Sequence, residues 1–360
     1  MKPFYIDPDI TKAETLPSYF YTSQEVYDAL IEKVFAKTWQ FIGDQSLVSL
    51  DSQVYPFKFL EFGLEEPMLL SNDQGDINCL SNVCTHRGNI LCHQAGSTKG
   101  ITCAYHGRRF NLKGEFQHMP QFKEAEDFPR KEDHLHSFPI KKWGPWLFTA
   151  LERGMDFQAV LDVMDKKVGF LPLDEFKLDK SRNKDYLVNA HWALYCDNYL
   201  EGFHIPFVHS GLNEVLDYGK YETEIHGLLN LQIGHSSGGE HVFDLPENHE
   251  DFGKQISAYY FWIFPNMMFN FYPWGCSINV VKPIALNRTK VSFITYVWDE
   301  SKLDTGAGAA LDKVEREDEF VVEGVFKGMH SRIYQTGRFS PKMEKGVHHF
   351  HGLLAEFLRG

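Results

Sequence analysis

Cys84-Thr85-His86 and Cys103-Ala104-Tyr105-His106 each combine one cysteine with one histidine. One residue separates the pair in the first motif, and two residues separate it in the second. Two thiolates and two imidazoles at this spacing can hold a [2Fe–2S] cluster, with both cysteines on one iron and both histidines on the other. The motifs therefore predict Cys84, His86, Cys103 and His106 as the ligands of a Rieske-type cluster.

A structural zinc site would use the same residue types. Zinc sites usually group cysteine with cysteine and histidine with histidine, whereas each motif here contains both types. Gly88 and Gly107 follow the two motifs closely. Glycine lets loop backbone approach inorganic sulfide and donate hydrogen bonds to it. The pattern favours the iron–sulfur cluster over zinc.

The composition predicts a globular protein of two or three domains. The chain has 360 residues, of which 43% are hydrophobic, and a formal net charge of −13. This charge argues against nucleic acid or an anionic membrane as a partner. The N-terminal residues lack a signal-peptide pattern, and prolines and asparagines interrupt the most apolar stretch, residues 258–274. We expect a cytoplasmic protein with reduced cysteines outside the cluster.

Periodicity divides the chain into three regions. Residues 1–38 contain an amphipathic helix capped by Ser23. The next region, to about residue 151, shows short strands at 59–62, 68–70, 77–80 and 146–151, with a hairpin turn at Asp73-Gln74-Gly75-Asp76. The last region contains a helix at 192–203, strands at 259–264, 268–272, 278–281 and 291–298, a low-complexity start at 306–310 and a long helix at 309–334. Both cluster motifs therefore lie on loops of the β-rich region.

A second metal site is predicted in the last region. Asn198, Glu201 and His204 are spaced i, i+3, i+6, which places them on one helix face. His209 lies five residues after His204, and Pro206 breaks the helix between them, so that His209 can turn back toward His204. Two histidines with one carboxylate form the ligand set of non-haem Fe(II) oxygenases.

The long C-terminal helix offers the carboxylate. Its apolar stripe consists of Leu311, Val314, Val321, Val325 and Met329, and Asp318 fills the missing step of that stripe. We expect the neighbouring residues Glu315, Glu317 and Glu319 to point to solvent. A lone carboxylate on a buried stripe is costly unless it is paired or binds a metal. We therefore predict a mononuclear iron at His204, His209 and Asp318, although hydrogen-bonded residues without a metal remain the alternative.

The chain resembles the terminal oxygenase (α) subunits of Rieske non-haem iron oxygenases, and is most similar to their choline- and carnitine-monooxygenase-like members. The resemblance covers nearly the whole chain, through the two cluster motifs, the Asn198-x₂-Glu201-x₂-His204-x₄-His209 pattern and the Glu317-Asp318 pair. It implies an α+β fold in which a Rieske β-sandwich domain is inserted into a helix-grip catalytic domain, an antiparallel sheet plus a long C-terminal helix. The implied boundaries are 1–38 for the N-terminal segment of the catalytic domain, 39–152 for the Rieske domain and 153–360 for the mononuclear iron domain.

The resemblance also implies cofactors and partners. These are a [2Fe–2S] cluster, a mononuclear Fe(II), O₂ as co-substrate, NAD(P)H acting through a flavin- or ferredoxin-type reductase, and a small-molecule substrate. A homotrimer is implied, in which the cluster of one subunit faces the iron of its neighbour. Glu201 then corresponds to the carboxylate that bridges the two centres, where many members have Asp, and Asn198 to a polar residue near the iron.

Gly107-Arg108-Arg109 departs from the family pattern, because many members have Trp after the glycine. Arg87, Arg108, Arg109 and Lys113 are basic residues near the cluster in an acidic chain. They form either a docking patch for an acidic reductase or scattered surface charge.

The substrate is predicted from a dense aromatic run. It comprises Tyr259, Tyr260, Phe261, Trp262, Phe264, Phe269, Phe271, Tyr272 and Trp274. Three interpretations are open: a cage for a quaternary ammonium group, an apolar pocket for an aromatic ring, or a hydrophobic core. Trp262, Phe271 and Phe203 are the candidate substrate contacts. We expect hydroxylation or N-demethylation of a quaternary ammonium compound. The alternatives are an aromatic-ring dioxygenase and a Rieske electron-transfer protein without oxygenase activity.

Overall fold

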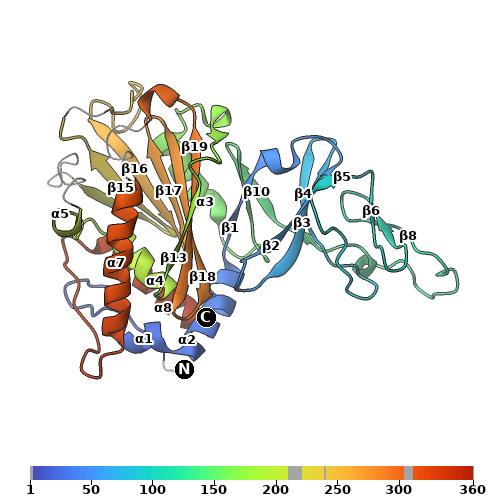
Figure 1. The fold of residues 1–360 in the computed structure, drawn as a ribbon, viewed down its shortest axis with the longest axis horizontal. Coiled ribbons are helices and arrows are strands. Elements are labelled where there is room, and N and C mark those ends of the chain that lie inside the picture. Colours follow the sequence, from blue (N-terminus) through green and yellow to red (C-terminus); the bar gives the residue numbers. More distant parts are fainter. Residues whose placement is uncertain (1–2, 210–220, 239–240, 304–310, 360) are drawn as a thin grey trace. The chain divides into compact units, whose positions relative to one another are not determined.

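The computed structural model describes residues 3–209, 221–238, 241–303 and 311–359. Contacts within the chain divide it into two compact units, residues 36–155 and residues 1–35 together with 156–360 (Figure 1). The low-complexity stretch 306–310 lies outside the described residues. No helix in the described ranges is long and apolar enough to cross a lipid bilayer.

The smaller unit is built from short antiparallel strands. Its sheets have the orders β1-β11-β10, β5-β2-β3-β4-β9 and β6-β7-β8. The strands are β1 (Gln40–Asp44), β2 (Gln53–Phe59), β3 (Glu66–Asp73), β4 (Asp76–Ser81), β5 (Gly96–Ser97), β6 (Ile101–Thr102), β7 (Arg109–Phe110), β8 (Phe116–His118), β9 (Ser137–Phe138), β10 (Ile140–Trp143) and β11 (Trp146–Thr149). The β-rich character predicted for this region is confirmed.

The turn between β3 and β4 follows from its sequence. Asp73 pairs with Asp76 across the hairpin, and both central residues have positive φ, 55° at Gln74 and 97° at Gly75. Two positive φ angles define the type I′ turn, whose twist matches that of the strands. The strand predicted at residues 59–62 is wrong. Strand β2 ends at Phe59, and positive φ angles at Leu60 and Phe62 place these residues in a turn.

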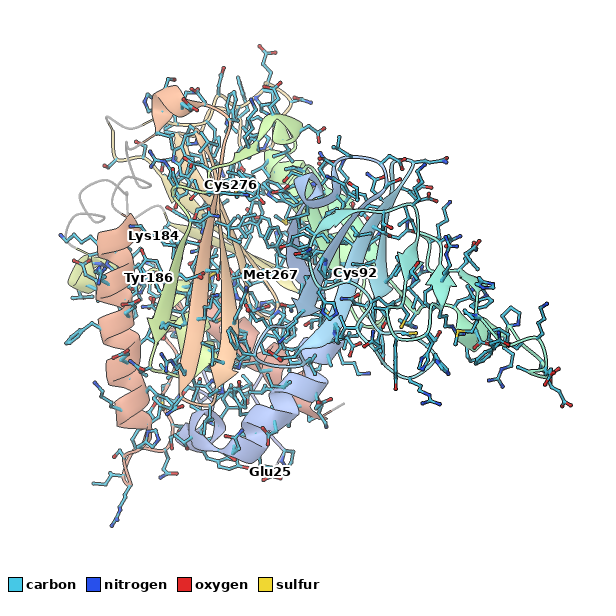
Figure 2. The ribbon with its side chains drawn as sticks, turned by 45° about the vertical axis from the view of Figure 1, so that its right-hand side comes forward. Glu25, Cys92, Lys184, Tyr186, Met267 and Cys276 are labelled. Carbon is cyan, nitrogen blue, oxygen red and sulfur yellow. The ribbon has the colours of Figure 1, made fainter. Side chains whose placement is uncertain are left out.

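The larger unit contains one antiparallel sheet. Within the described residues its order is β12-β19-β18-β17-β16-β15-β14, and β13 also pairs with β19. The strands are β12 (Lys177–Leu178), β13 (Lys184–Val188), β14 (Glu222–His226), β15 (Leu229–His235), β16 (Ile256–Ile263), β17 (Met267–Tyr272), β18 (Gly275–Ala285) and β19 (Arg288–Val297). Met267 and Cys276, labelled on the central strands in Figure 2, are fully buried.

Helices accompany this sheet, and α7 runs along one side of it in Figure 1. They are α1 (Ser18–Thr22), α2 (Gln24–Lys33), α3 (Phe157–Val168), α4 (Trp192–Tyr199), α5 (Ile205–Val208), α7 (Leu311–Met329) and α8 (Lys345–Arg359). As predicted, Ser23 caps α2, since its side chain accepts a hydrogen bond from the Val26 N–H. The predicted α+β class, with an antiparallel sheet and a long C-terminal helix, is confirmed.

The predicted inner face of α7 is shifted by one residue. Val322 and Phe326 are buried, and Glu315 is only 3% exposed, whereas Val325 is 41% exposed. The buried face therefore follows positions 315, 322 and 326. Asp318 also lies on this face, because residues three and four apart are neighbours on a helix. The valines at 321 and 325 suggested the wrong stripe because small apolar residues also occur on exposed helix surfaces.

Candidate functional site

His204 and His209 lie at the two ends of a single helical turn. Helix α4 ends at Tyr199, before the predicted boundary at 203, and α5 spans Ile205–Val208. Pro206 lies in the first turn of α5 rather than interrupting a longer helix, and proline is tolerated there because its N–H would have no partner anyway. His204 precedes this turn and His209 follows it, and their rings lie 5.1 Å apart between centroids.

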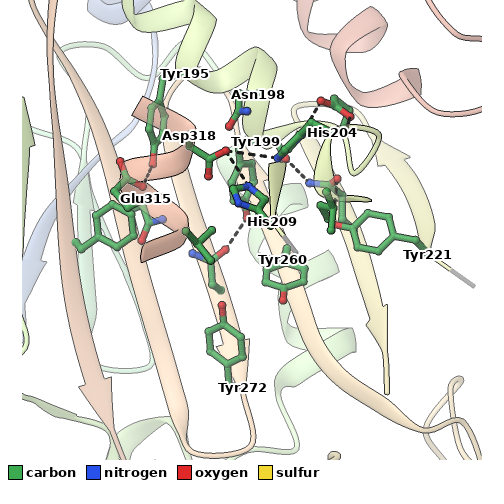
Figure 3. A pocket seen from close by; sticks show the side chains of 17 residues that line it. Tyr195, Asn198, Tyr199, His204, His209, Tyr221, Tyr260, Tyr272, Glu315 and Asp318 are labelled. Atoms are coloured by element: carbon green, nitrogen blue, oxygen red, sulfur yellow. Dashed lines mark hydrogen bonds and ion pairs between the residues drawn. The ribbon is translucent and has the colours of Figure 1, made fainter. Parts of the chain in front are cut away.

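Asp318 of α7 meets both histidines. Its Oδ1 atom lies 3.0 Å from His209 Nε2 and 3.5 Å from His204 Nε2 (Figure 3). One ligand atom from each of the three residues lies within 4.8 Å of the others. Two imidazole nitrogens and one carboxylate match the facial ligand set of non-haem Fe(II). The residues predicted from the sequence are thus brought together in an arrangement that fits a single metal ion.

A carboxylate holds the outer nitrogen of each histidine. Glu201 Oε1 lies 2.7 Å from His204 Nδ1, and Glu317 Oε2 lies 2.8 Å from His209 Nδ1. Each Nδ1–H therefore donates a hydrogen bond to a carboxylate oxygen, which leaves the Nε2 lone pair for a metal. Glu201 Oε2 also accepts hydrogen bonds from the backbone N–H groups of Phe203 and His204.

The environment of His209 favours positive charge at this centre. Burial lowers the pKa of His209, but the hydrogen bonds and charges of Asp318 and Glu317 outweigh burial, so that the pKa lies above its ordinary value. The solvated position expected for Glu317 is wrong, because its carboxylate binds His209. The same expectation for Glu315 is also wrong. Glu315 is buried and accepts a hydrogen bond of 2.6 Å from Tyr195 Oη.

The three residues open onto a cavity of about 130 Å³. Asn198, which was also predicted as a site residue together with Glu201, lines the cavity too. The other described side chains on its wall are mostly tyrosines and polar residues: Tyr195, Tyr199, Glu201, Ile205, Tyr221, Gln232, Tyr260, Asn270, Tyr272, Asn279, Phe293, Val314 and Glu315. Tyr199 Oη donates a hydrogen bond of 2.6 Å to Asn270 Oδ1, which fixes part of the floor.

Strand register explains which side chains reach this cavity. Gln232, Tyr260, Asn270 and Ser277 are direct neighbours across β15, β16, β17 and β18. Side chains alternate between the two faces of a sheet, so this row shares one face. It forms a polar strip across the sheet, with Gln232, Tyr260 and Asn270 on the cavity wall.

The predicted substrate contacts Trp262, Phe271 and Phe203 do not line the cavity. Phe271 pairs with Tyr259 on the opposite face of the sheet. Trp262 shares a face with Tyr260 but is covered by Phe350 of α8, with 5.0 Å between ring centroids. Phe203 is partly exposed and contacts Phe207. Most of the aromatic run thus forms hydrophobic core, which was one of the three interpretations. Tyr260 and Tyr272 are its members on the cavity wall.

The cluster loops bring their four predicted ligands together. The rings of His86 and His106 lie 4.8 Å apart between centroids, and the Cys84 and Cys103 thiols interact at the buried end of the loops. Asn89 Nδ2 lies 3.7 Å from Cys103 Sγ. Two buried thiols and two partly exposed imidazoles fit a [2Fe–2S] cluster with cysteines inside and histidines at the tip.

Arg108 does not belong to a surface patch. Its side chain is 2% exposed and forms an ion pair of 2.6 Å with Asp133. Burial raises the pKa of Asp133, but hydrogen bonds from the Arg130 N–H and from Arg108 outweigh it, so that the carboxyl stays ionised. Lys113 pairs with Asp73 and Asp76 at 3.5 and 3.6 Å. The proposed basic docking patch is therefore reduced to Arg87 and Arg109.

Comparisons with known proteins agree with this geometry. Residues 38–139 match the Rieske [2Fe-2S] domain, and residues 173–360 match the catalytic domain of the ring hydroxylating alpha subunit. Choline monooxygenase from Beta vulgaris is 30% identical over 98% of this chain and 79% of its own length. The carnitine monooxygenase oxygenase subunit from Escherichia coli K12 is 26% identical over 97% of this chain and 95% of its own.

Solved structures share the fold. A quaternary ammonium Rieske monooxygenase in complex with L-carnitine superposes with a TM-score of 0.75 at 23% identity, covering 98% of this chain and 97% of its own. Naphthalene 1,2-dioxygenase from Rhodococcus sp. superposes with a TM-score of 0.72 at 15% identity, covering 96% and 94%. At these identities the two structures support the fold alone.

Proposed function

Because the chain belongs to the family of ring-hydroxylating α subunits, we propose that it is a terminal oxygenase acting on a small quaternary ammonium compound. Its cofactors are a Rieske [2Fe–2S] cluster and a mononuclear iron, and it uses O₂ with electrons from a reductase. The observation that carries the proposal is the meeting of His204, His209 and Asp318 on the wall of a cavity. Iron bound there supplies O₂ activation, while the cluster supplies single electrons.

The protein's own groups prepare this centre. Glu201 and Glu317 hold the histidine rings in the tautomer that presents Nε2, and Asp318 supplies the anionic ligand. Tyr195 and Tyr199 are hydrogen-bonded to Glu315 and Asn270, so that their rings keep a fixed orientation on the wall. We propose that Asn198 positions a polar group or a water beside the metal.

The cavity supports a cationic substrate. Five tyrosines lie among its described lining residues: Tyr195, Tyr199, Tyr221, Tyr260 and Tyr272. The face of an aromatic ring attracts a quaternary ammonium group by about 0.5–2 kcal/mol. Glu315 adds a buried carboxylate, and no lysine or arginine occurs among the lining residues that the structure describes. The relatives named choline and carnitine monooxygenase support the same substrate class.

Electron delivery between subunits is part of the proposal. We propose that residues 39–152 form the cluster domain, that residues 1–38 and 153–360 form the catalytic domain, and that the chain assembles as a cytoplasmic homotrimer. Exposed aromatic side chains beside each metal centre support the proposal that another subunit covers these surfaces. Phe207, which is 82% exposed, lies next to the metal histidines, and the exposed Tyr105 ring lies against His106 with 3.7 Å between ring centroids and 33° between the ring planes. Glu201 then bridges His204 to a cluster histidine of the neighbouring subunit.

Substrate oxidation with a neutral control tests the proposal. The reconstituted protein, supplied with a ferredoxin-type reductase and NADH, is given choline, carnitine, glycine betaine and 3,3-dimethyl-1-butanol, the uncharged isostere of choline. We expect O₂ uptake and an oxidised or N-demethylated product with at least one cation, and none with the isostere. Turnover of naphthalene or indole without any turnover of the cations would instead support an aromatic-ring oxygenase. Cluster reduction without O₂ uptake on any substrate would support an electron-transfer protein.

A further inference from the structure

The two cluster loops are built on the same backbone plan. In each loop the cysteine carbonyl accepts a 3.0 Å hydrogen bond from a glycine four residues later, Gly88 for Cys84 and Gly107 for Cys103. Both glycines have left-handed φ angles, 71° and 73°. In each loop the cysteine N–H also donates a 2.8 Å bond to the carbonyl five residues later. That fifth residue is Asn89 in the first loop and Arg108 in the second, so the two positions are structurally equivalent.

The side chains at these two equivalent positions differ in charge. Asn89 is neutral, and its amide points across to the Cys103 thiol of the other loop. Arg108 introduces a full positive charge at the matching position. Its Nη2 atom donates to the Asp133 carboxylate at 2.6 Å and to the Asp133 carbonyl at 3.2 Å. The buried Nε–H has no hydrogen-bond partner among the described residues.

An aromatic wall keeps water away from this charge. The Arg108 guanidinium carbon lies 5.8, 5.1 and 5.4 Å from the ring centroids of Phe110, Phe116 and Phe128. A charge in such surroundings is screened less than a surface charge and acts over a longer distance. The charge is also tied to the first cluster loop, because the Asp133 carbonyl that accepts from Arg108 accepts a 2.9 Å hydrogen bond from the Thr85 hydroxyl, and Thr85 lies between Cys84 and His86.

We propose that Arg108 raises the reduction potential of the [2Fe–2S] cluster, and that its ion pair with Asp133 sets how much of the charge the cluster experiences. Reduction adds one electron from the reductase to the cluster and breaks no bond. The reduced cluster is therefore one unit more negative, and a buried cation stabilises it relative to the oxidised cluster. Arg108 thus favours electron entry from the reductase over electron exit to the mononuclear iron.

The midpoint potential of the cluster in the full-length protein tests this proposal. It is measured by spectroelectrochemical titration of visible absorption, with electron paramagnetic resonance as the second readout. Arg108→Met is expected to lower the equilibrium constant for cluster reduction at least tenfold, which is 59 mV for a one-electron couple. Arg109→Met is the matched control, because the adjacent arginine is exposed at the start of β7, directly after the loop. It is expected to change the equilibrium constant less than twofold.

Asp133→Asn separates charge from packing. Loss of the anion leaves the Arg108 charge less compensated, so the potential is expected to rise, opposite to the change in Arg108→Met. General damage to the loop would instead shift the midpoint potentials of Asp133→Asn and Arg108→Met in the same direction. The proposal is overturned if Arg108→Met lowers the midpoint potential no more than Arg109→Met does, or if Asp133→Asn does not raise it. If Arg108→Met fails to hold the cluster, the sign of the shift in Asp133→Asn decides. None of these readouts depends on the identity of the substrate.

Discussion

Glu317 provides a sharp test of how the metal histidines are held. The Oε2 atom lies 2.8 Å from His209 Nδ1, and the His209 side chain is 1% exposed. Replacing Glu317 by Gln retains an acceptor oxygen but removes its charge, and replacing it by Ala removes the acceptor. Neither change replaces a predicted metal ligand. We expect both variants to bind Fe(II) more weakly at the mononuclear site, with a smaller loss of affinity for Gln and a larger loss for Ala.

The size of the loss follows from the hydrogen bond. A bond to a charged acceptor contributes about 1.5–3 kcal/mol, and a neutral bond contributes about 0.5–1.5 kcal/mol. Glu317→Gln therefore costs about 1.4 kcal/mol, or roughly tenfold in the Fe(II) dissociation constant. Glu317→Ala leaves a buried N–H without an acceptor. It should weaken binding roughly 100-fold, at the upper end of effects from residues that orient a ligand.

Competition with a coloured chelator under anaerobic conditions measures this affinity, after the mononuclear iron has been removed and the cluster retained. Glu323→Gln on the same helix is the control, because Glu323 accepts hydrogen bonds from Asn189 and contacts neither histidine. The cluster absorption confirms that each sample is intact. If Glu317→Ala binds Fe(II) within twofold of Glu323→Gln, then Glu317 does not hold His209 in its binding orientation.

Three further predictions address electron delivery, substrate charge and stability. Glu201→Gln should retain both metals but slow single-turnover reduction of the mononuclear iron at least tenfold; an unchanged rate would refute the bridging role. Glu315→Gln should raise KM for a quaternary ammonium substrate roughly tenfold, because it removes a buried negative charge whose attraction to the substrate contributes about 1.4 kcal/mol to binding. An equal rise in KM for an uncharged substrate would contradict an electrostatic role. Lys167 is buried among Glu224, Glu250 and Asp251, at 2.8–3.2 Å. Lys167→Met should lower the free energy of unfolding by about 3–5 kcal/mol in urea titrations, since the buried cation shared by three carboxylates is removed. A loss under about 1 kcal/mol would show that Lys166 and Lys254, which already pair with Glu250 and Asp251, compensate for it.

Local patterns in the sequence predict much of the fold. The strands of the larger sheet, the cap at Ser23 and the turn at Asp73–Asp76 depend on neighbouring residues, so their signals are contained within short segments. The strand expected at 59–62 failed because positive φ angles at Leu60 and Phe62 are rare for such residues and leave no sequence signal. The face of α7 was misplaced by one position because Val321 and Val325 are partly exposed, whereas Glu315 is buried.

The residues around the site depend on contacts between distant segments. The sequence indicates Asp318, since a carboxylate interrupts an apolar stripe, but it does not reveal that Glu317 binds His209, 108 residues away. Tyr260 and Tyr272 are distinguished from Trp262 and Phe271 by strand register and by the cover of α8. The burial of Arg108 likewise depends on Asp133, 25 residues away. Such pairings become visible when the fold is known.

The central claim is that one chain holds two separate iron centres, and the metal content of the purified protein tests it most directly. We expect three irons and two acid-labile sulfides per chain. We also expect His204→Ala combined with His209→Ala to remove one iron and leave the cluster spectrum unchanged. Two irons per chain in the unaltered protein, or a third iron that persists in the double variant, would contradict this claim.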